Sequence, residues 1–247
     1  WICPSARAVA HKAAELISGM IVQAVADHRM CNIALAGGST PRMLYTALAE
    51  SVGDCDVLWG SVNVFFSDER NVPHDHVDSN YHIAQRTLLD FVPIPPQQIH
   101  PMPADAEDLA AAAVSYEQAI RQTVPAGADG IPRFDLVLLG VGADGHTASL
   151  FPGSPALDER ESLIVSPHVQ SLGRDRMTFT YPLINAASVV MMLITQRDKT
   201  AVVSKMFGPS AQTIPAGRVQ PTDGEHWVLL DSAAAKKLAP QFRSVAG

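Results

Sequence analysis

Short apolar runs alternate with amphipathic stretches along most of this chain. The runs predict strands, and they cover Cys31–Ala36, Val62–Phe66, Leu136–Leu139, Leu163–Val165, Met177–Thr180, Val189–Thr195 and His226–Leu230, with a brief further candidate at Gln98–His100. The stretches between them predict helices over Ser5–His28, Arg42–Glu50, Tyr81–Phe91, Ala104–Thr123, Arg197–Phe207 and Ser232–Leu238. This alternation predicts an α/β fold with a doubly wound, largely parallel sheet flanked by helices on both faces, as in Rossmann-like proteins.

Length and composition narrow the class of protein. The chain has 247 residues, 47% of them hydrophobic and 17% charged, and no low-complexity linker divides it, so we expect one domain over residues 1–247. The net charge of −7 argues against general nucleic-acid binding, and no apolar stretch is long enough to predict a membrane span. Cys3, Cys31 and Cys55 are widely spaced and odd in number, which favours a reducing, cytoplasmic setting over a disulfide framework.

The stretch from Phe134 to Gly153 carries the strongest candidate chemistry. It predicts a buried strand, Leu136–Leu139, that ends in a glycine-rich loop. In a parallel sheet this loop lies at the carboxyl edge of the strands, where open α/β sheets bind ligands. Asp144 and His146 lie on it and are therefore our candidates for proton transfer.

The same loop admits two other interpretations. Its letters satisfy Gly-x-Gly-x-x-Gly, but His146–Leu150 allows little more than one helical turn before Phe151-Pro152-Gly153 interrupts it. The acid expected about 20 residues later to hold a ribose is also missing, since residue 165 is a valine. A nicotinamide or flavin site is thus disfavoured, whereas a glycine turn with a merely buried, hydrogen-bonded histidine stays open.

A second glycine loop follows the first of the longer predicted strands. Gly37, Gly38, Ser39 and Thr40 precede Pro41, which suits the first position of a helix, with Ser39 or Thr40 as its N-cap. The N–H groups and positive dipole end of such a helix form an anion site, which favours phosphate. The loop is too short for a Walker A motif, and a plain strand-to-helix turn is the alternative.

Charged residues near other strand ends are the remaining candidates. Asp68 and Arg70 follow the strand that ends at Phe66, and they are either solvated or part of a site. Arg176 and Lys199 also fall at strand ends, where a bound anion could meet them, although such a residue alone is usually a surface charge.

The loop His74-Asp75-His76-Val77-Asp78 has the His-x-His-x-Asp spacing used by binuclear metal hydrolases. Ser79 stands where the next histidine of that motif is needed, and Asp78-Ser79 is explained more simply as a helix cap. We therefore favour a solvated loop and expect no metal site.

Four motifs follow one another along the chain. They are Ala-Gly-Gly-Ser-Thr-Pro-Arg at Ala36–Arg42, Phe-Phe-Ser-Asp-Glu-Arg at Phe65–Arg70, Asp-Ser-Asn-Tyr at Asp78–Tyr81 and Gly-Ala-Asp-Gly-His-Thr-Ala-Ser-Leu-Phe-Pro-Gly at Gly142–Gly153. Taken together, they resemble those of the 6-phosphogluconolactonases. The match continues through Arg176–Thr178 and Pro182–Ala187 to Lys199 and Trp227, so it covers nearly the whole chain. Several motifs in the right order are far more specific than any one of them.

The resemblance implies hydrolysis of 6-phosphoglucono-δ-lactone to 6-phosphogluconate in the oxidative pentose phosphate pathway, without a cofactor. It implies that His146 is the general base and that Asp144 orients the imidazole. The residues then expected to bind the substrate and its phosphate are Gly37, Gly38, Ser39, Thr40, Asp68, Arg70, Arg176 and Lys199. Whether Arg70 meets the phosphate or the sugar ring is left open. We expect no nucleic-acid or membrane partner, and a monomer or weak homodimer.

Two other functions occur on the fold that the resemblance implies. Glucosamine-6-phosphate deaminase is similar in its Asp-Gly-His loop, but it carries a glutamate five residues after the histidine, where this chain has Phe151. The carboxylate that assists ring opening in the deaminase is therefore missing here. Non-catalytic sugar-phosphate sensors need a DNA-binding module, and Ser5–His28 has no room for a helix-turn-helix. The sequence thus favours the lactonase.

Overall fold

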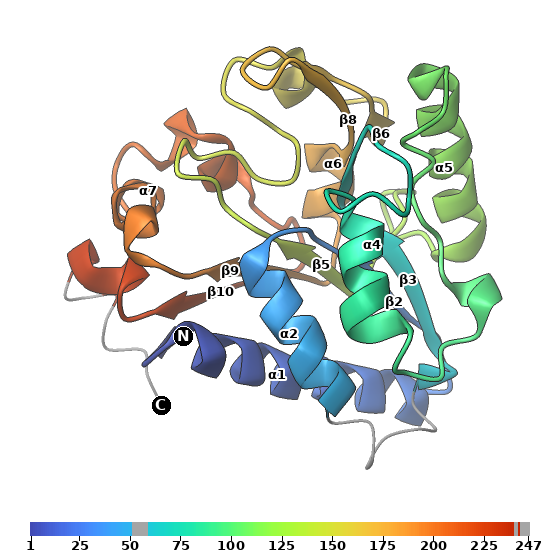
Figure 1. The fold of residues 1–247 in the computed structure, drawn as a ribbon, viewed down its shortest axis with the longest axis horizontal. Helices are drawn as coiled ribbons and strands as arrows, with labels where there is room; N and C mark the ends of the chain where they lie inside the picture. The colour runs from blue at the N-terminus through green and yellow to red at the C-terminus, as the bar shows by residue number, and fades with distance from the viewer. Residues whose placement is uncertain (51–58, 240–241, 243–247) are drawn as a thin grey trace.

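The fold is built on a six-stranded parallel sheet (Figure 1). The structure, a computed structural model, describes residues 1–50, 59–239 and 242, so Cys55 lies outside the described residues. The strand order is β1-β10-β9-β5-β2-β3, and every pair in it is parallel. The strands are β1 (Ile2–Cys3), β2 (Cys31–Leu35), β3 (Val62–Phe66), β5 (Leu136–Leu139), β9 (Val189–Ile194) and β10 (Glu225–Asp231). The predicted doubly wound α/β fold is confirmed, although the edge strand β1 was not predicted.

The strand order places the reversal of the chain between β2 and β5. After β2 the chain adds β3 on one side of it, and it later adds β5, β9 and β10 on the other. At such a reversal the loops that leave the two strands diverge, and ligands bind in the crevice outside the carboxyl ends. The loops after β2 and β5 begin at Ala36 and Gly140. Both glycine loops singled out in the sequence therefore open into the same crevice.

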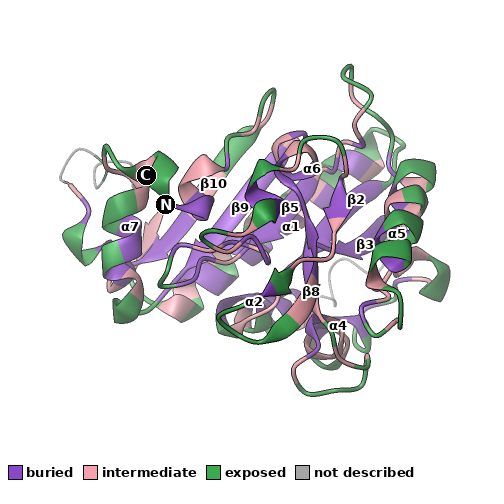
Figure 2. Ribbon diagram, turned by 90° about the horizontal axis from the view of Figure 1, so that it is seen from above, coloured by how far each residue is buried: buried purple, intermediate pink, exposed green. Residues whose placement is uncertain are grey.

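Helices flank this sheet on both faces (Figure 1). They are α1 (Ala6–Ala26), α2 (Ser39–Glu50), α4 (Asn80–Ala84), α5 (Leu109–Thr123), α6 (Tyr181–Asn185) and α7 (Thr200–Met206). Strands β2, β3, β5 and β9 are buried along their whole length, as Figure 2 shows, whereas α5 presents an exposed outer face. Burial on both faces explains why β5 and β9 are continuous apolar runs, whereas β2 and β3 each bury one asparagine, Asn32 and Asn63, which are hydrogen-bonded to each other. Among the described residues, no helix combines the length and apolar character needed to cross a bilayer.

A smaller antiparallel sheet continues from the carboxyl end of β3. It consists of β4 (Asp68–Arg70), β8 (Arg174–Phe179) and β6 (Ile164–Val165), with β7 (His168–Val169) paired to the start of β8. The sequence prediction treated Asp68 and Arg70 as loop or site residues and placed Arg176 just before a strand. They lie within strands because β4 pairs with β8, a segment distant in the sequence.

Helix boundaries differ from the predicted ones where a side chain or a tighter turn intervenes. The helix predicted over Ala104–Thr123 begins only at Leu109, because the Asp108 side chain accepts the N–H of Ala111 at 3.0 Å and caps it there. Other differences are an unpredicted helix α6, a π-helix at Gln85–Leu89 after α4 and a 3₁₀ turn at Arg197–Lys199 before α7. A 3₁₀ turn at Ala234–Lys237 replaces the helix Ser232–Leu238, and an isolated bridge at Ile99 replaces the strand Gln98–His100.

A buried glutamate joins the small sheet to the start of α4. Glu69 is 0% exposed, and its Oε1 accepts the N–H groups of Arg70 at 2.8 Å and Asn80 at 2.7 Å. Its Oε2 accepts the N–H of Tyr81 at 2.9 Å and the hydroxyl of Ser79 at 3.0 Å. Burial raises the pKa of Glu69, an effect that the backbone N–H groups partly offset. This anchoring fixes the strand that carries Arg70.

We expect Glu69→Gln to lower the free energy of unfolding by about 2 to 4 kcal/mol. A glutamine offers one acceptor oxygen, so its amide nitrogen would face donors that the carboxylate now accepts. Urea unfolding followed by far-UV circular dichroism measures the change. Glu161→Gln is the matched control, because Glu161 is exposed and its substitution should change stability by less than about 0.5 kcal/mol. Equal stabilities of the two variants would contradict the anchoring role.

Candidate active site

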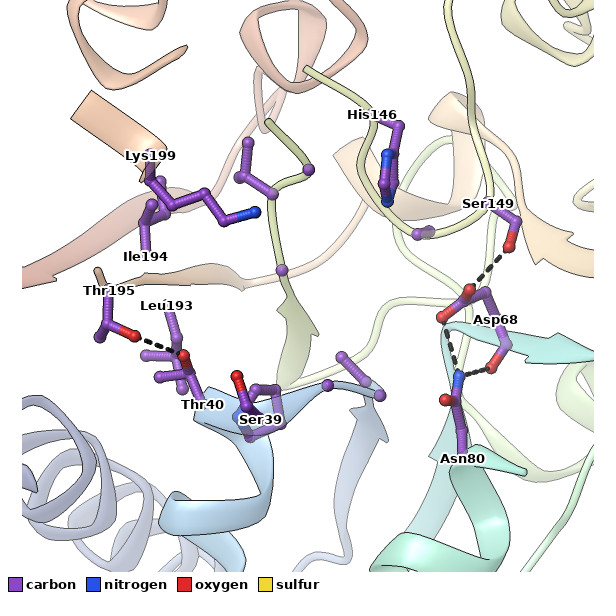
Figure 3. A pocket seen from close by; sticks show the side chains of 18 of the residues that line it. Ser39, Thr40, Asp68, Asn80, His146, Ser149, Leu193, Ile194, Thr195 and Lys199 are labelled. Atoms are coloured by element: carbon purple, nitrogen blue, oxygen red, sulfur yellow. Dashed lines mark hydrogen bonds between the residues drawn. The ribbon is translucent and has the colours of Figure 1, made fainter. Parts of the chain in front are cut away.

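A pocket of about 280 Å³ lies in the crevice between the loops that follow β2 and β5 (Figure 3). The end of β9 and the small antiparallel sheet supply its other walls. All of the predicted site residues except Asp144 line it: Gly37, Gly38, Ser39, Thr40, Asp68, Arg70, His146, Arg176 and Lys199. Segments far apart in the sequence therefore meet at one site, as the predicted topology requires.

A tight turn delivers His146 to this pocket. The N–H of Gly142 donates to the carbonyl of His146 at 2.8 Å, which closes the turn. A Cβ at position 142 would collide with the imidazole of His146 and the carboxylate of Asp144, so only glycine fits there. The stretch His146–Leu150, which has room for little more than one helical turn, forms no helix, because Thr147 and Leu150 pair across a second turn.

Asp144 makes two contacts with His146. Its Oδ1 lies 2.6 Å from His146 Nδ1 and accepts the backbone N–H of His146 at 3.1 Å. Burial would raise the pKa of Asp144, but these hydrogen bonds and the adjacent imidazole hold it below its usual value. The ionised carboxylate favours the tautomer with the proton on Nδ1, which leaves Nε2 available on a ring that points into the pocket (Figure 3). Phe151 stacks on this ring, with 4.2 Å between ring centroids.

The N-terminus of α2 forms a second wall of the pocket. The helix begins at Ser39, so the predicted start at Pro41 is wrong. Thr40 does not cap the helix through its side chain, because its hydroxyl lies 2.7 Å from that of Thr195 at the end of β9. The N–H groups of Ser39 and Thr40 precede the first helical hydrogen bond, which Arg42 donates, and have no acceptor within the helix. Together with the helix dipole, they suit an anion.

Cationic side chains converge on the same cavity. Arg70 and Arg176 are direct cross-strand partners on β4 and β8, an arrangement of like charges that is unfavourable without an anion nearby. Among the described residues, Arg176 Nε has no hydrogen-bond partner although it is buried, and burial followed by the charge of Arg70 lowers the guanidinium pKa. Lys199 extends into the pocket from the segment after β9 (Figure 3). The pocket lining thus carries three cationic side chains beside the carboxylates of Asp68 and Asp198, and Lys199 Nζ lies 3.5 Å from Asp198 Oδ2.

A hydrogen-bond network that the sequence did not predict fixes Asp68 in the pocket wall (Figure 3). The Ser149 hydroxyl donates to Asp68 Oδ2 at 2.7 Å, and the Asn80 amide donates to Asp68 Oδ1 at 3.2 Å and to its backbone carbonyl at 2.8 Å. A Cβ at Gly37 would collide with the Asn80 amide, so the network also limits where the glycine loop can lie. The only sequence signal for Asn80 and Ser149 is that each falls inside a motif.

His74 and His76 do not line the pocket, and each makes a hydrogen bond outside it. His74 Nε2 lies 2.7 Å from the carbonyl oxygen of Met102, and His76 Nδ1 accepts the N–H of Asp78 at 3.1 Å. Within the ranges that the structure describes, no group of three or more His, Cys, Asp or Glu side chains is arranged to hold a metal ion.

Comparison with known proteins places this chain in a family. Residues 4–228 match the family described as glucosamine-6-phosphate isomerases/6-phosphogluconolactonase. The 6-phosphogluconolactonase of Synechocystis sp. is 42% identical over 226 residues, which cover 91% of this chain and 91% of the relative. That of Rattus norvegicus is 36% identical over 244 residues, 96% of this chain and 89% of the relative. The solved 6-phosphogluconolactonase of Trypanosoma brucei has a TM-score of 0.85 and 30% identity over 97% of this chain and 98% of its own. The chain belongs to the glucosamine-6-phosphate isomerase/6-phosphogluconolactonase family.

Proposed function

We propose that this protein hydrolyses 6-phosphoglucono-δ-lactone to 6-phosphogluconate in the oxidative pentose phosphate pathway. One observation carries the proposal: a single pocket is lined by His146, which is hydrogen-bonded to Asp144, by the N-terminus of α2 and by three cationic side chains from other elements. Hydrolysis of a lactone needs a base for water, and the phosphate of the substrate needs cations and N–H donors. The relatives named 6-phosphogluconolactonase support this choice of substrate.

His146 is the general base in this mechanism. Its Nε2 takes a proton from water while the water oxygen attacks the lactone carbonyl carbon and forms a tetrahedral oxyanion. When that intermediate collapses, the bond from the carbonyl carbon to the ring oxygen breaks, and the imidazolium returns its proton to the leaving ring oxygen. Asp144 keeps the ring in the required tautomer and stabilises the imidazolium between these steps.

The phosphate binds at the opposite side of the pocket from the base. The N–H groups of Ser39 and Thr40 donate to its oxygens, and Lys199 and Arg176 neutralise its charge. Gly37 and Gly38 let the backbone approach the phosphate, and Arg70 adds to the positive wall. Asp68, held by Asn80 and Ser149, accepts a hydrogen bond from a hydroxyl group of the sugar.

We also propose a cytoplasmic location and a monomer or weak homodimer. The location is supported by Cys3 and Cys31, which are free thiols. Relatives from rice are named chloroplastic, so fractionation of the source cells is the test of location. Sedimentation equilibrium tests the state of association.

We expect His146→Ala to lower kcat by about 10² to 10⁴ without unfolding the protein, because the base for water is lost. Hydrolysis of freshly generated lactone, corrected for the spontaneous reaction, measures the effect. His11→Ala is the control, since His11 is exposed on α1 and does not line the pocket. Wild-type turnover by a folded His146→Ala protein would remove His146 from the mechanism.

The phosphate contacts should make unphosphorylated glucono-δ-lactone a much poorer substrate. Each lost charge-assisted contact is worth about 1.5 to 3 kcal/mol, so kcat/KM should fall by at least about 10². Lys199→Ala should reduce the difference in kcat/KM between the two lactones, because it removes one of the contacts from the phosphorylated substrate alone. Equal kcat/KM for the two lactones in the wild type would defeat the phosphate assignment.

Phe151 separates this hydrolase from a deaminase. An apolar ring stacked on His146 cannot relay a proton to a sugar ring oxygen, so we expect no ammonia from glucosamine 6-phosphate even after long incubation. Phe151→Leu should keep most lactonase activity, because it preserves an apolar wall at a modest packing cost. Phe151→Glu should impair activity, since a second carboxylate beside Asp144 adds like-charge repulsion. Ammonia release by the wild type would make the deaminase the better account.

A further inference from the structure

The turn after β9 contains a backbone conformation that L-residues rarely adopt. Gln196 has φ +84° and ψ +154°, a region open essentially to glycine alone. A non-glycine residue stays there only when the surrounding structure holds it, and such residues cluster at functional sites. Gln196 lies in the pocket wall, between the end of β9 and Lys199. Its strain therefore falls at the proposed phosphate site.

Asp231, the last residue of β10, holds this turn from the neighbouring strand. Its Oδ2 accepts the N–H of Gln196 at 3.0 Å, and its Oδ1 accepts the N–H of Ala234 at 2.7 Å. The residue is 6% exposed and does not line the pocket. A carboxylate this deeply buried is stable only when both oxygens are hydrogen-bonded, which makes its two backbone partners part of one rigid unit.

Gln196 in turn sets the position of Lys199. The carbonyl of Gln196 accepts the N–H of Lys199 at 3.3 Å and so starts the 3₁₀ turn Arg197–Lys199. On its other side, Thr195 is tied to Thr40 at the N-terminus of α2. The dihedral angles of Gln196 thus set the direction in which the chain leaves the anchored strand. An ordinary negative φ would turn the segment that carries Lys199 away from its present place.

We propose that Asp231 is a positioning residue for phosphate recognition, because it holds the strained Gln196 peptide and thereby places the Lys199 ammonium on the side of the pocket that faces Ser39 and Thr40 (Figure 3). The inference rests on the proposed function, since it assumes that the pocket receives a phosphate. Asp231 touches no substrate atom and acts only through the turn.

The strain is tested by replacing Gln196 with the residue its backbone favours. Gln196→Gly should raise the midpoint of thermal unfolding by about 2 to 5 °C. Gln220→Gly is the matched control, because Gln220 is also exposed, has no positive φ, and donates its N–H to a side chain, Asn185 Oδ1, at 2.9 Å. The control should lower the midpoint through the added freedom of the unfolded chain. An equal fall for Gln196→Gly would show an unstrained turn and overturn the proposal.

The positioning role is tested by kinetics and rescue. Asp231→Ala should raise KM for the phosphorylated lactone about 10-fold, change kcat by less than about 3-fold, and leave kcat/KM for glucono-δ-lactone unchanged. Adding Gln196→Gly should restore KM to within about 3-fold of the wild type, because glycine adopts the conformation without the carboxylate. A merely structural defect would act on both lactones and would not be rescued at position 196. An unchanged KM, or an increase without rescue, would overturn the proposal.

If Asp231→Ala does not fold alone, the double variant is compared with Gln196→Gly. The proposal expects the same KM for the phosphorylated lactone in both, and a difference above about 3-fold would contradict it.

Inorganic phosphate separates this inference from the proposed function. Phosphate should raise the thermal midpoint of the wild type by binding the folded state, and Asp231→Ala should need about 10-fold more phosphate for the same shift. If that pattern appears in a protein that does not hydrolyse the lactone, the proposed function fails and the positioning role stands. If the lactone is hydrolysed but the phosphate response does not depend on Asp231, the positioning role fails alone.

Discussion

Strands β2 and β5 pair in parallel at the point where the chain reverses the direction in which it adds strands. The rest of the site depends on this pairing. It places the ends of both strands side by side, so the loop with the N-terminus of α2 and the loop with His146 face each other across one crevice. Both strands are fully buried, which holds these ends against the core and leaves little freedom to the loops they release. The site is therefore a consequence of sheet topology as much as of its own residues.

The charges around the crevice run against the composition of the chain. The protein has a net charge of −7, yet Arg70, Arg176 and Lys199 all line the pocket. The carboxylates of Asp68 and Asp198 also line it, so the cations outnumber the carboxylates there although the chain as a whole is negative. The guanidinium groups of Arg70 and Arg176 repel each other across the strands, Asp68 and Glu69 offset part of this repulsion, and a bound phosphate would relieve it further. Part of the binding free energy of an anion would thus come from removing an unfavourable interaction already present.

The local sequence predicted those parts of the site that local geometry determines. Strand β5 was predicted at its observed bounds, and His146 and Asp144 meet because they share one short turn. Individual side-chain contacts between distant segments could not be predicted from local sequence patterns. The strand character of β4 depends on pairing with β8, and the role of Asn80 depends on Asp68 and on the glycine loop. No local pattern encodes such partners, because the side chains that meet are set by the packed fold.

The predicted helix start at Pro41 is wrong for a related reason. Proline is favoured at the first helical position, and Ser39 and Thr40 are good N-caps, so local preference places the start of α2 at Pro41. In the fold Thr40 has a better partner, the Thr195 hydroxyl on β9, and the helix begins earlier. The same competition explains the strained turns of the pocket. In the loop after β2 the residue with a positive φ is a glycine, Gly38. The loop after β5 has a non-glycine residue with a positive φ, Ala148, and so does the turn after β9, Gln196. Ala148 precedes Ser149, whose hydroxyl donates to Asp68 on β4. The N–H of Gln196 donates to Asp231 on β10. The pocket walls are therefore set by tertiary contacts before any ligand arrives, which is the condition under which fixed dipoles and cations stabilise developing charge without reorganising.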